Sequence, residues 1–281
     1  MNINTSGTLY IVATPIGNLQ DMSLRAVETL KKVDVIAVED TRHSAPLLQH
    51  FAVTTPTLAL HDHNERDRAA LLLKRLQKGE SIALISDAGT PLISDPGYHL
   101  VSEAKNAGIT VVPIPGACAA IAALSAAGLP TDRFVFEGFL PVKTAARTAR
   151  LKELDSEART LIFYEAPHRI MDVLQDMQAV FGDARRVVVA RELTKMFETI
   201  RSGTLAEIVA WANADKNQQR GEIVILVEGA EKTAATDPDV QRVLTILLEA
   251  LPLKQAVELA AKITNQRKNE LYQQALKQKI E

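Results

Sequence analysis

The sequence has little of several features that would place it in a special class. Its 281 residues include one cysteine, Cys118, and only 4% aromatic residues. A single cysteine cannot form a disulfide within the chain or a cysteine-rich metal site, which fits a reducing compartment. No apolar run approaches the roughly 20 residues that span a bilayer, and residues 1–8 lack the basic and apolar leader of a secretory signal. We therefore expect a soluble, cytoplasmic protein without a membrane partner.

A strong charge of one sign is also missing, because the formal net charge is only −2. Nucleic-acid binding would need local basic patches rather than a surface that is basic all over. The sequence also lacks the G-x-x-x-x-G-K-[ST] motif, which disfavours a P-loop nucleotide hydrolase. No G-x-G-x-x-G follows the first predicted strand.

What the sequence does contain is a regular alternation of short β-branched runs and longer amphipathic stretches. The first round predicts strands at 9–13, 33–38, 81–86 and 110–113, with helices at 23–32, 65–78 and 98–107. The second predicts strands at 133–137, 160–164, 186–190 and 222–227, with helices at 170–181 and 205–213. This order is typical of α/β domains, the first with a largely parallel sheet.

The last fifth of the chain breaks this alternation. Residues 231–239 have no apolar periodicity and are predicted to form a linker, and the remainder reads as helical. We predict an N-terminal α/β domain over 1–116, a second α/β domain over 117–230, the linker, and a helical C-terminal domain over 240–281.

Three loops of the first half follow strand ends, where open α/β sheets bind their ligands. A tight turn at residues 13–18 contains Pro15 and Gly17, although a plain strand-to-helix turn would look the same. Residues 87–97 hold two Asp, two Pro and two Gly but no Lys or Arg, which suits an amino-acid–nucleoside conjugate better than a phosphate. Alternatively, Asp95 is only the N-cap of the next helix.

The third loop, Pro113–Gly116, leads into a helix of very small residues that would let a flat ring approach closely. Cys118 in this helix is expected to be a packing residue, since no partner makes it a nucleophile. In the second half, Phe139 and charged residues cluster just past strand ends. Singly these charges read as caps or solvated groups, but together they indicate a cleft.

Together these segments resemble the tetrapyrrole methylase superfamily, and more closely its ribosomal RNA branch, the small-subunit ribose 2′-O-methyltransferase I family. The resemblance covers residues 7–229, and the C-terminal helices are similar to the tail of that family. It is carried by LYIVATPIGNL (9–19), VEDTR (38–42), LHDHNE (60–65), DAGTPLISDPG (87–97), PIPG (113–116), YEAPHR (164–169) and ARELTK (190–195).

The resemblance implies an α/β fold of two tetrapyrrole methylase domains, with S-adenosylmethionine as methyl donor in the cleft between them. It also implies a homodimer, and as partner the small-subunit ribosomal RNA, methylated on the ribose of a cytidine in the decoding region; no DNA is implied. The residues that it assigns to the donor site are Pro15, Asp87, Gly89, Leu92, Ile93, Ser94, Cys118, Ala119, Tyr164, Leu193 and Gly221.

A ribose hydroxyl is a poor nucleophile, so a general base or a cation near the developing alkoxide would help. The candidates for this catalytic role are Glu39, Asp40, Arg42, Glu165, His168 and Lys195. Each of them could instead serve in a structural pair, for instance Asp40 with Arg42. His61 and His63, with Asp62 and Glu65, suggest a metal, but methyl transfer needs none, and we favour RNA contact or hydrogen bonding there.

The RNA-binding candidates are basic residues in two segments, 141–152, which holds no acid, and the tail, where basic residues outnumber acidic ones. Lys143, Arg147 and Arg150 lie in the segment 141–152, which is expected to form a loop or helix at the mouth of the cleft. In the tail, residues 254–264 and 268–277 have helix-turn-helix spacing, and Lys268 begins the second of these helices. A solvated helix face and a helical cap are the alternatives. The rival functions are methylation of a tetrapyrrole precursor and a non-catalytic RNA-binding assembly factor.

Overall fold

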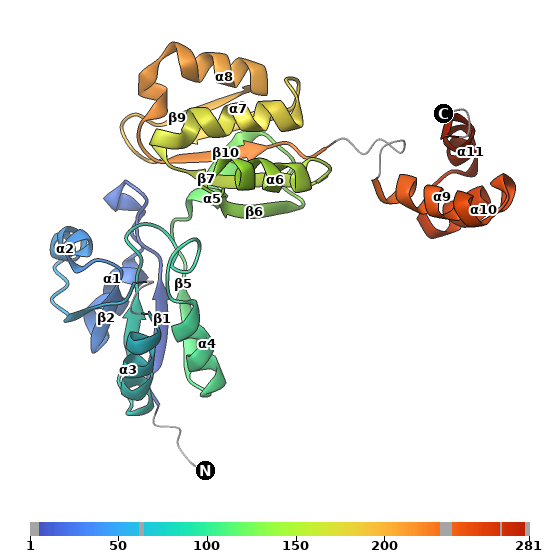
Figure 1. Cartoon of the computed structure of the whole chain (residues 1–281). Coiled ribbons are helices and arrows are strands. Elements are labelled where there is room, and N and C mark those ends of the chain that lie inside the picture. The colour runs from blue at the N-terminus through green and yellow to red at the C-terminus, as the bar shows by residue number, and fades with distance from the viewer. Residues whose placement is uncertain (1–5, 62–64, 231–237, 265, 279–281) are drawn as a thin grey trace. The chain divides into compact units, whose positions relative to one another are not determined.

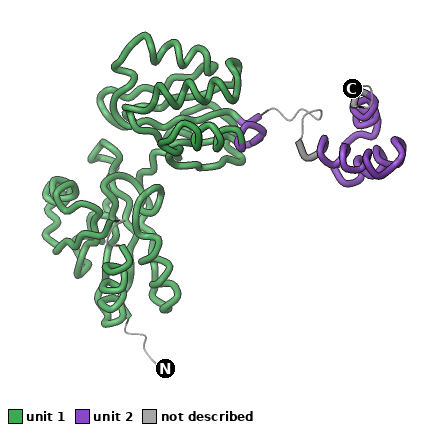
Figure 2. The backbone as a smooth tube through the Cα atoms, in the orientation of Figure 1, with its two compact units in different colours: residues 1–152, 160–228 green, residues 153–159, 229–281 purple. Residues whose placement is uncertain are grey.

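The computed structural model describes residues 6–61, 65–230, 238–264 and 266–278. Contacts divide the chain into two compact units, one of residues 1–152 and 160–228 and the other of residues 153–159 and 229–281 (Figure 2). Unit 1 holds two β-sheets, and unit 2 holds the C-terminal helices (Figure 1). None of the described helices is long and apolar enough to cross a membrane.

The first sheet of unit 1 has five strands in the order β3-β2-β4-β1-β5, and every pair is parallel, as predicted. Its elements are β1 (Thr8–Val12), η1 (Leu19–Asp21), α1 (Leu24–Lys32), β2 (Val35–Val38), α2 (Thr41–His50), β3 (Thr57–Ala59), α3 (Glu65–Gln77), β4 (Ile82–Leu84), α4 (Tyr98–Asn106) and β5 (Thr110–Ile114). Because all strands run the same way, their carboxyl ends share one edge.

Both faces of this sheet are covered, which explains why its strands are continuous apolar runs. Leu9 packs with the apolar faces of α3 and α4 in one cluster. Val12 packs with those of α1 and α2 in another. Alternate residues of a single strand thus supply two separate cores.

The second sheet has the order β6-β7-β10-β8-β9 and is mixed. β6 is parallel to β7, whereas β10 is antiparallel to β7 and β8, and β9 is antiparallel to β8. Helix α5 packs on one face, and α7 and α8 lie over the other (Figure 1). The elements are α5 (Ala119–Ala127), β6 (Phe134–Phe139), α6 (Thr144–Leu154), β7 (Thr160–Glu165), η2 (Pro167–Arg169), α7 (Ile170–Phe181), β8 (Arg186–Arg191), β9 (Thr199–Thr204), α8 (Leu205–Ala214), η3 (Lys216–Gln219) and β10 (Ile223–Val227).

The structure adds three elements that the apolar pattern did not predict. Helix α2 contains Pro46, which weakens any helical pattern. β3 has only three residues at the sheet edge. β9 is an edge strand whose central residues, Arg201 to Gly203, are polar or lack a side chain.

The N-terminus of α4 is capped differently from the sequence-based alternative. We considered Asp95 as the N-cap, but Gly97 holds that position and makes no side-chain cap. The buried carboxylate of Glu65, at the start of α3, accepts from the backbone N–H groups of Gly97 (3.0 Å) and His99 (2.9 Å) instead. Asp95 therefore does not cap α4.

Unit 2 contains α9 (Pro238–Ala250), α10 (Leu253–Thr264) and α11 (Lys268–Gln278). Leu244, Val257 and Leu271 come one from each helix and are buried together, with Val243, Leu247 and Leu248 packed against them. The apolar stripe of the first helix is therefore buried within the helical unit itself. The predicted linker, 231–239, lies largely outside the described residues and overlaps the start of α9; the predicted domain boundaries stay predictions.

The cap of α4 leads to a stability test. Replacing Glu65 with Ala leaves two backbone N–H groups without their acceptor, which we expect to cost about 1–3 kcal/mol of unfolding free energy each. Glu65→Gln keeps a carbonyl acceptor and should recover part of the loss. The control is Asp67→Ala on the exposed face of the same helix. Urea unfolding that places Glu65→Ala level with this control would contradict the cap.

Candidate active site

Three loops at the carboxyl edge of the first sheet are hydrogen-bonded to one another. Thr14, after β1, and Gly89, after β4, exchange two backbone bonds of 2.8 and 3.1 Å. The Thr90 hydroxyl donates to the carbonyl of Ala117, after β5, at 2.9 Å. The three sequence motifs of the first half therefore form one connected surface.

Asp87 lies on this surface at the end of β4. One of its carboxylate oxygens accepts from the backbone N–H of Asp40 at 3.4 Å, so the loop after β2 helps to hold it. Asp40 itself caps α2 and is paired with Arg42 at 2.9 Å. The hydrogen bond from Arg42 lowers the pKa of Asp40 to about 2. This confirms the structural pairing that was the alternative to catalysis for these two residues.

Backbone strain gathers in two loops, one from each sheet. Leu92 (φ 73°) and Ser94 (φ 64°) follow β4, and Glu192 (φ 51°) and Thr194 (φ 66°) follow β8. A residue with a side chain in this region costs on the order of 1–3 kcal/mol, and such residues concentrate at functional sites. Both loops contribute to the same pocket.

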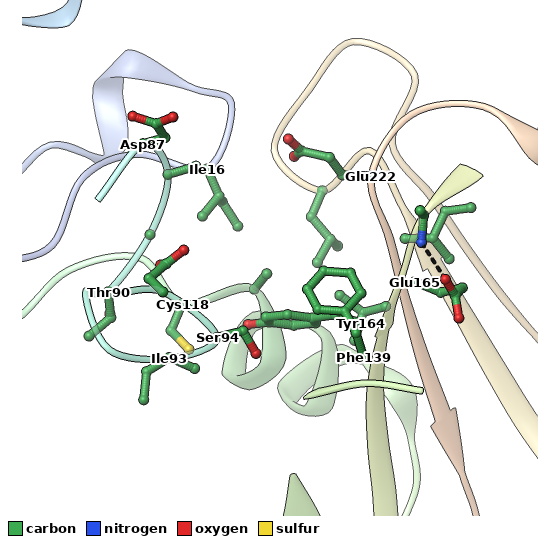
Figure 3. Close-up of a pocket in the computed structure, with 18 of the residues that line it drawn as sticks. Ile16, Asp87, Thr90, Ile93, Ser94, Cys118, Phe139, Tyr164, Glu165 and Glu222 are labelled. Atoms are coloured by element: carbon green, nitrogen blue, oxygen red, sulfur yellow. Dashed lines mark hydrogen bonds between the residues drawn. The ribbon is translucent and has the colours of Figure 1, made fainter. Parts of the chain in front are cut away.

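That pocket has a volume of about 420 Å³. Figure 3 shows Asp87, Thr90, Ile93 and Ser94 of the first half facing Phe139 and Tyr164 of the second. The full lining is Ile16, Glu39, Asp87, Ala88, Gly89, Thr90, Ile93, Ser94, Asp95, Cys118, Ala119, Phe139, Tyr164, Glu165, Ala166, Pro167, Ala190, Leu193, Glu222, Ile223 and Val224.

The lining combines acids with apolar side chains. Five acidic residues contribute to it, and none of the described residues that line it is Lys, Arg or His. Glu165 turns its carboxylate away and Glu222 pairs with Lys195, so the negative charge at the pocket comes mainly from the other three acids; it favours a cation over a phosphate. The small or apolar residues between the acids suit a flat, weakly polar group. The pocket fits a ligand that carries positive charge and a ring system.

Tyr164 forms the fixed wall on the side of the second sheet. Its hydroxyl accepts from the backbone N–H of Ala120 at 3.1 Å, and its ring meets those of Phe136 and Phe139 edge to face. Burial raises the pKa of Tyr164, so the phenol stays neutral. It serves as a shaped surface rather than as a proton acceptor.

Lys195 joins the two halves of unit 1 beside the pocket. Its aliphatic stem lies against Gly17, where an added Cβ would come within 2.5 Å of it. Its ammonium group donates to Glu192 (2.8 Å) and Glu222 (3.0 Å). Although burial lowers the pKa of Lys195, these two carboxylates raise it overall. The charge is neutralised by its neighbours, which argues against a free catalytic cation.

Glu165 lines the pocket with its backbone but not with its carboxylate. Tyr164 and Glu165 are successive residues of β7 and point to opposite faces, and Figure 3 shows the carboxylate across the strand from the rings. One oxygen accepts from the N–H of Ala166 (2.7 Å) and lies 3.4 Å from Arg169 Nε. Within the described part of the chain, the other oxygen has no hydrogen-bond partner. Burial raises the pKa of this carboxyl.

The six catalytic candidates thus separate by position. Glu39 lines the pocket, Glu165 turns its carboxylate away, and Asp40, Arg42 and Lys195 are ion-paired outside it. His168 is exposed in η2 and is not part of the lining. His63 and Asp62 lie outside the described residues. Among residues that are described, no group of three or more His, Cys, Asp or Glu could hold a metal ion.

Most residues that the resemblance assigned to the donor do line the pocket. Pro15, Leu92 and Gly221 do not, although each has a neighbour in sequence that does. Sequence reasoning missed Ile16, which lies inside a recognised motif, and Ala190, Ile223 and Val224, which look like ordinary strand residues. The pocket-lining residues from the assigned set are Asp87, Gly89, Ile93, Ser94, Cys118, Ala119, Tyr164 and Leu193.

The four basic residues predicted to bind RNA differ in exposure and in ion pairing. Arg147 is buried, with only 3% of its surface exposed, and pairs with Asp176 at 2.6 Å, so it is not available to RNA. Arg150 makes three hydrogen bonds to Glu137. Lys143 is exposed. Lys268, in unit 2, lies 3.4 Å from Glu258 and is half-exposed.

Comparison with known proteins assigns the fold and the site to a class. The family described as Tetrapyrrole (Corrin/Porphyrin) Methylases matches residues 8–209, and the RsmI C-terminal HTH domain matches residues 234–279. The chain therefore belongs to the tetrapyrrole methylases, as its motifs predicted, and its helical tail is of the expected kind.

Full-length relatives narrow this class. The chain is 60% identical over 275 residues to the Ribosomal RNA small subunit methyltransferase I of Pseudomonas aeruginosa, covering 97% of this chain and 98% of that one. It is 56% identical over 276 residues to the protein of the same name from Escherichia coli O157:H7, covering 98% and 96%. Within the tetrapyrrole methylases, the chain belongs to the ribosomal RNA small subunit methyltransferase I family.

Solved structures agree on the fold. The methyltransferase CobJ superposes with a TM-score of 0.60 at 20% identity, covering 80% of this chain and 95% of that one. Diphthine synthase superposes with a TM-score of 0.60 at 15% identity, covering 79% and 90%. At these identities the likeness concerns the fold alone.

The raised pKa of Glu165 predicts a pH-dependent effect on stability. The folded state holds this proton more tightly than the unfolded state, so the fold loses stability as the pH rises from the carboxyl's unfolded pKa to its raised folded pKa, and the loss is complete above the folded pKa. Glu165→Gln should therefore melt higher than wild type at about pH 7.5, by about 2–4 °C for each kcal/mol relieved. The difference should vanish near pH 4, where both states are protonated. The control is Glu28→Gln, an exposed carboxylate on α1. A Gln variant that melts below wild type at neutral pH would contradict this account.

Proposed function

We propose that this protein transfers a methyl group from S-adenosylmethionine to the ribose 2′-hydroxyl of a cytidine in the decoding region of 16S ribosomal RNA. The observation that carries the proposal is the acidic, apolar-walled pocket, which lies at the motifs shared with the family. The names of the relatives support ribosomal RNA of the small subunit as the substrate class. Cytidine and its ribose oxygen come from the sequence resemblance.

The pocket fits the proposed donor by the charge and shape of its lining. S-adenosylmethionine carries a sulfonium and an ammonium group, and the acidic residues of the pocket favour both charges. The adenine ring would need a flat apolar slot, and Ala119, Tyr164 and Leu193 offer apolar walls. The residues that would hold the donor are thus Asp87, Gly89, Ile93, Ser94 and Cys118 from the first half and Tyr164 and Leu193 from the second.

The chemistry would depend on alignment and on one proton acceptor. When bound, the donor supplies an activated methyl group on its sulfonium. The chain's own residues would hold the ribose oxygen in line with it and exclude water from the pocket. Of the six catalytic candidates, Glu39 and Glu165 line the pocket, and the carboxylate of Glu165 points to the other face of β7. We therefore propose Glu39 as the acceptor of the hydroxyl proton.

The proposal includes two kinds of partner. Lys143 at the start of the α6 segment and the helix-turn-helix pair α10–α11 are proposed to contact RNA phosphates. A homodimer is proposed from the resemblance, and Met196 and Phe197, which are 90% and 69% exposed, supply apolar surface for it.

The function is tested by labelled methyl transfer onto purified small ribosomal subunits and onto naked 16S RNA. We expect label on one cytidine ribose in the decoding region, located by nuclease mapping and by resistance of that linkage to alkali. Label on a base, label at another nucleotide, or transfer only to a tetrapyrrole precursor would contradict the proposal.

The carboxylate of Asp87 should matter for the donor. Asp87→Asn removes a negative charge but keeps the acceptor for the Asp40 N–H, so the loop should hold its shape. We expect donor affinity to fall about tenfold to a hundredfold, the usual weight of a hydrogen bond to a charged group. Asp67→Asn, on an exposed helix face, is the matched control. Calorimetry that gives equal donor affinity for both variants would contradict a role of the Asp87 carboxylate in donor binding.

Glu39 should affect the rate rather than binding. Loss of a positioned general base lowers the rate by roughly a hundredfold to ten-thousandfold. Glu39→Gln should therefore reduce kcat to that extent while donor affinity stays within about twofold. A Glu39→Gln enzyme with wild-type kcat would remove Glu39 from the mechanism.

A further inference from the structure

Phe139 is a large aromatic side chain that lines the pocket and is still 55% exposed. Tyr164, beside it, is mostly buried and tied to Ala120. Figure 3 shows the two rings together on the same side of the pocket, and their centroids are 5.8 Å apart. Phe139 thus adds a free aromatic face to a wall that is otherwise closed.

A β-bulge directs this ring into the pocket. In the pairing of β6 with β7, Phe136 lies opposite Ile162 and Gly138 opposite Phe163, so Glu137 is the extra residue. Without the bulge, alternation would send Phe136 and Phe139 to opposite faces. With it, both rings lie against Tyr164. Bulges that re-aim a side chain are common beside active sites.

The backbone on either side of Phe139 is held in place. The bulged Glu137 is 10% exposed and binds the guanidinium of Arg150 at 2.7 and 3.0 Å. After the ring, Arg169 donates to the carbonyl oxygens of Leu140 (2.8 Å) and Pro141 (3.2 Å). The exposure of the ring is therefore imposed by the fold.

The residue before the ring is equally constrained. Gly138 has φ +65°, and a Cβ there would come within 3.1 Å of the Ser94 hydroxyl. The bulge therefore touches the strained loop of the first sheet and brings Phe139 next to it. The chain then continues into Val142, which is 75% exposed, and the exposed Lys143. An exposed aromatic ring, an apolar residue and a cation thus occur within five residues, and the first of them lines the pocket.

An aromatic face beside a cation is the combination with which proteins hold unstacked nucleotides, the ring for the base and the cation for the phosphate. We infer that Phe139 is the platform on which the base of the acceptor nucleotide stacks, so that its ribose enters the pocket. The inference rests on the proposed function and identifies a positioning residue for it. Phe139 stays more than half exposed while Tyr164 is held against Ala120, so we assign Phe139 to the acceptor and not to the donor.

The test measures methyl transfer to purified small ribosomal subunits together with donor affinity. Phe139→Ala and Phe139→Leu should raise KM for subunits about tenfold, the weight of one base–aromatic stack, while kcat changes little because the stack is present in ground state and transition state alike. The affinity for S-adenosylmethionine by calorimetry should stay within about twofold. Phe139→Trp should restore KM. Phe134→Ala, an exposed ring at the far end of the same strand and outside the pocket, is the control.

The outcomes separate the inference from the function it rests on. A donor affinity that falls in parallel with KM would assign the ring to the donor site and overturn the inference. So would a Phe139→Leu enzyme with wild-type KM, since an apolar side chain would then suffice. If wild-type protein does not methylate subunits, the proposed function fails and the inference with it; if it does and Phe139→Ala matches it, the inference alone fails.

Discussion

The pocket depends on how closely the two sheets of unit 1 approach each other. At two contacts a side chain in place of glycine would crowd the other half: Gly17 lies against the stem of Lys195, and Gly138 against the hydroxyl of Ser94. A third contact joins the helix after the first sheet to the second sheet, through the Ala120 N–H and Tyr164. Each half supplies only part of the lining: Asp87 and Ser94 come from the first half, and Phe139, Tyr164 and Glu222 from the second. The close approach is what turns two strand edges into one site.

Acidic and basic residues occupy different places at this site. The lining is acidic, while the basic groups nearby are already satisfied, Lys195 by Glu192 and Glu222, and Arg169 by Glu165 and two carbonyls. A cationic ligand therefore meets a lining that is acidic and that holds no basic side chain among its described residues, whereas an anion would meet charge of its own sign. The strained backbone at Leu92, Ser94, Glu192 and Thr194 keeps these loops in shapes that relaxed loops would not adopt.

Much of this arrangement could be predicted from the sequence. Parallel strands put their loops at one edge, so the segments 13–18, 87–97 and 113–116 had to meet, and Asp87 and Gly89 of the second segment line the pocket. The predictions that the structure corrected depend on contacts between residues that are far apart in the sequence. The ion pair of Arg147 with Asp176 joins segments far apart in sequence, and the carboxylate of Glu65 replaces Asp95 as a cap from another helix. The bulge at Glu137 shifts Phe139 to the pocket face, and neither strand periodicity nor composition reveals a shift of one residue.

The central claim is that both halves of unit 1 bind one donor molecule together. Hydrogen–deuterium exchange of the full chain, with and without S-adenosylmethionine, tests it most directly. The account predicts slower exchange at residues 87–97 and 116–120 and, at the same donor concentration, in the segment around Leu193 and at residues 222–224. Protection confined to one half, or protection of the C-terminal helices alone, would contradict it.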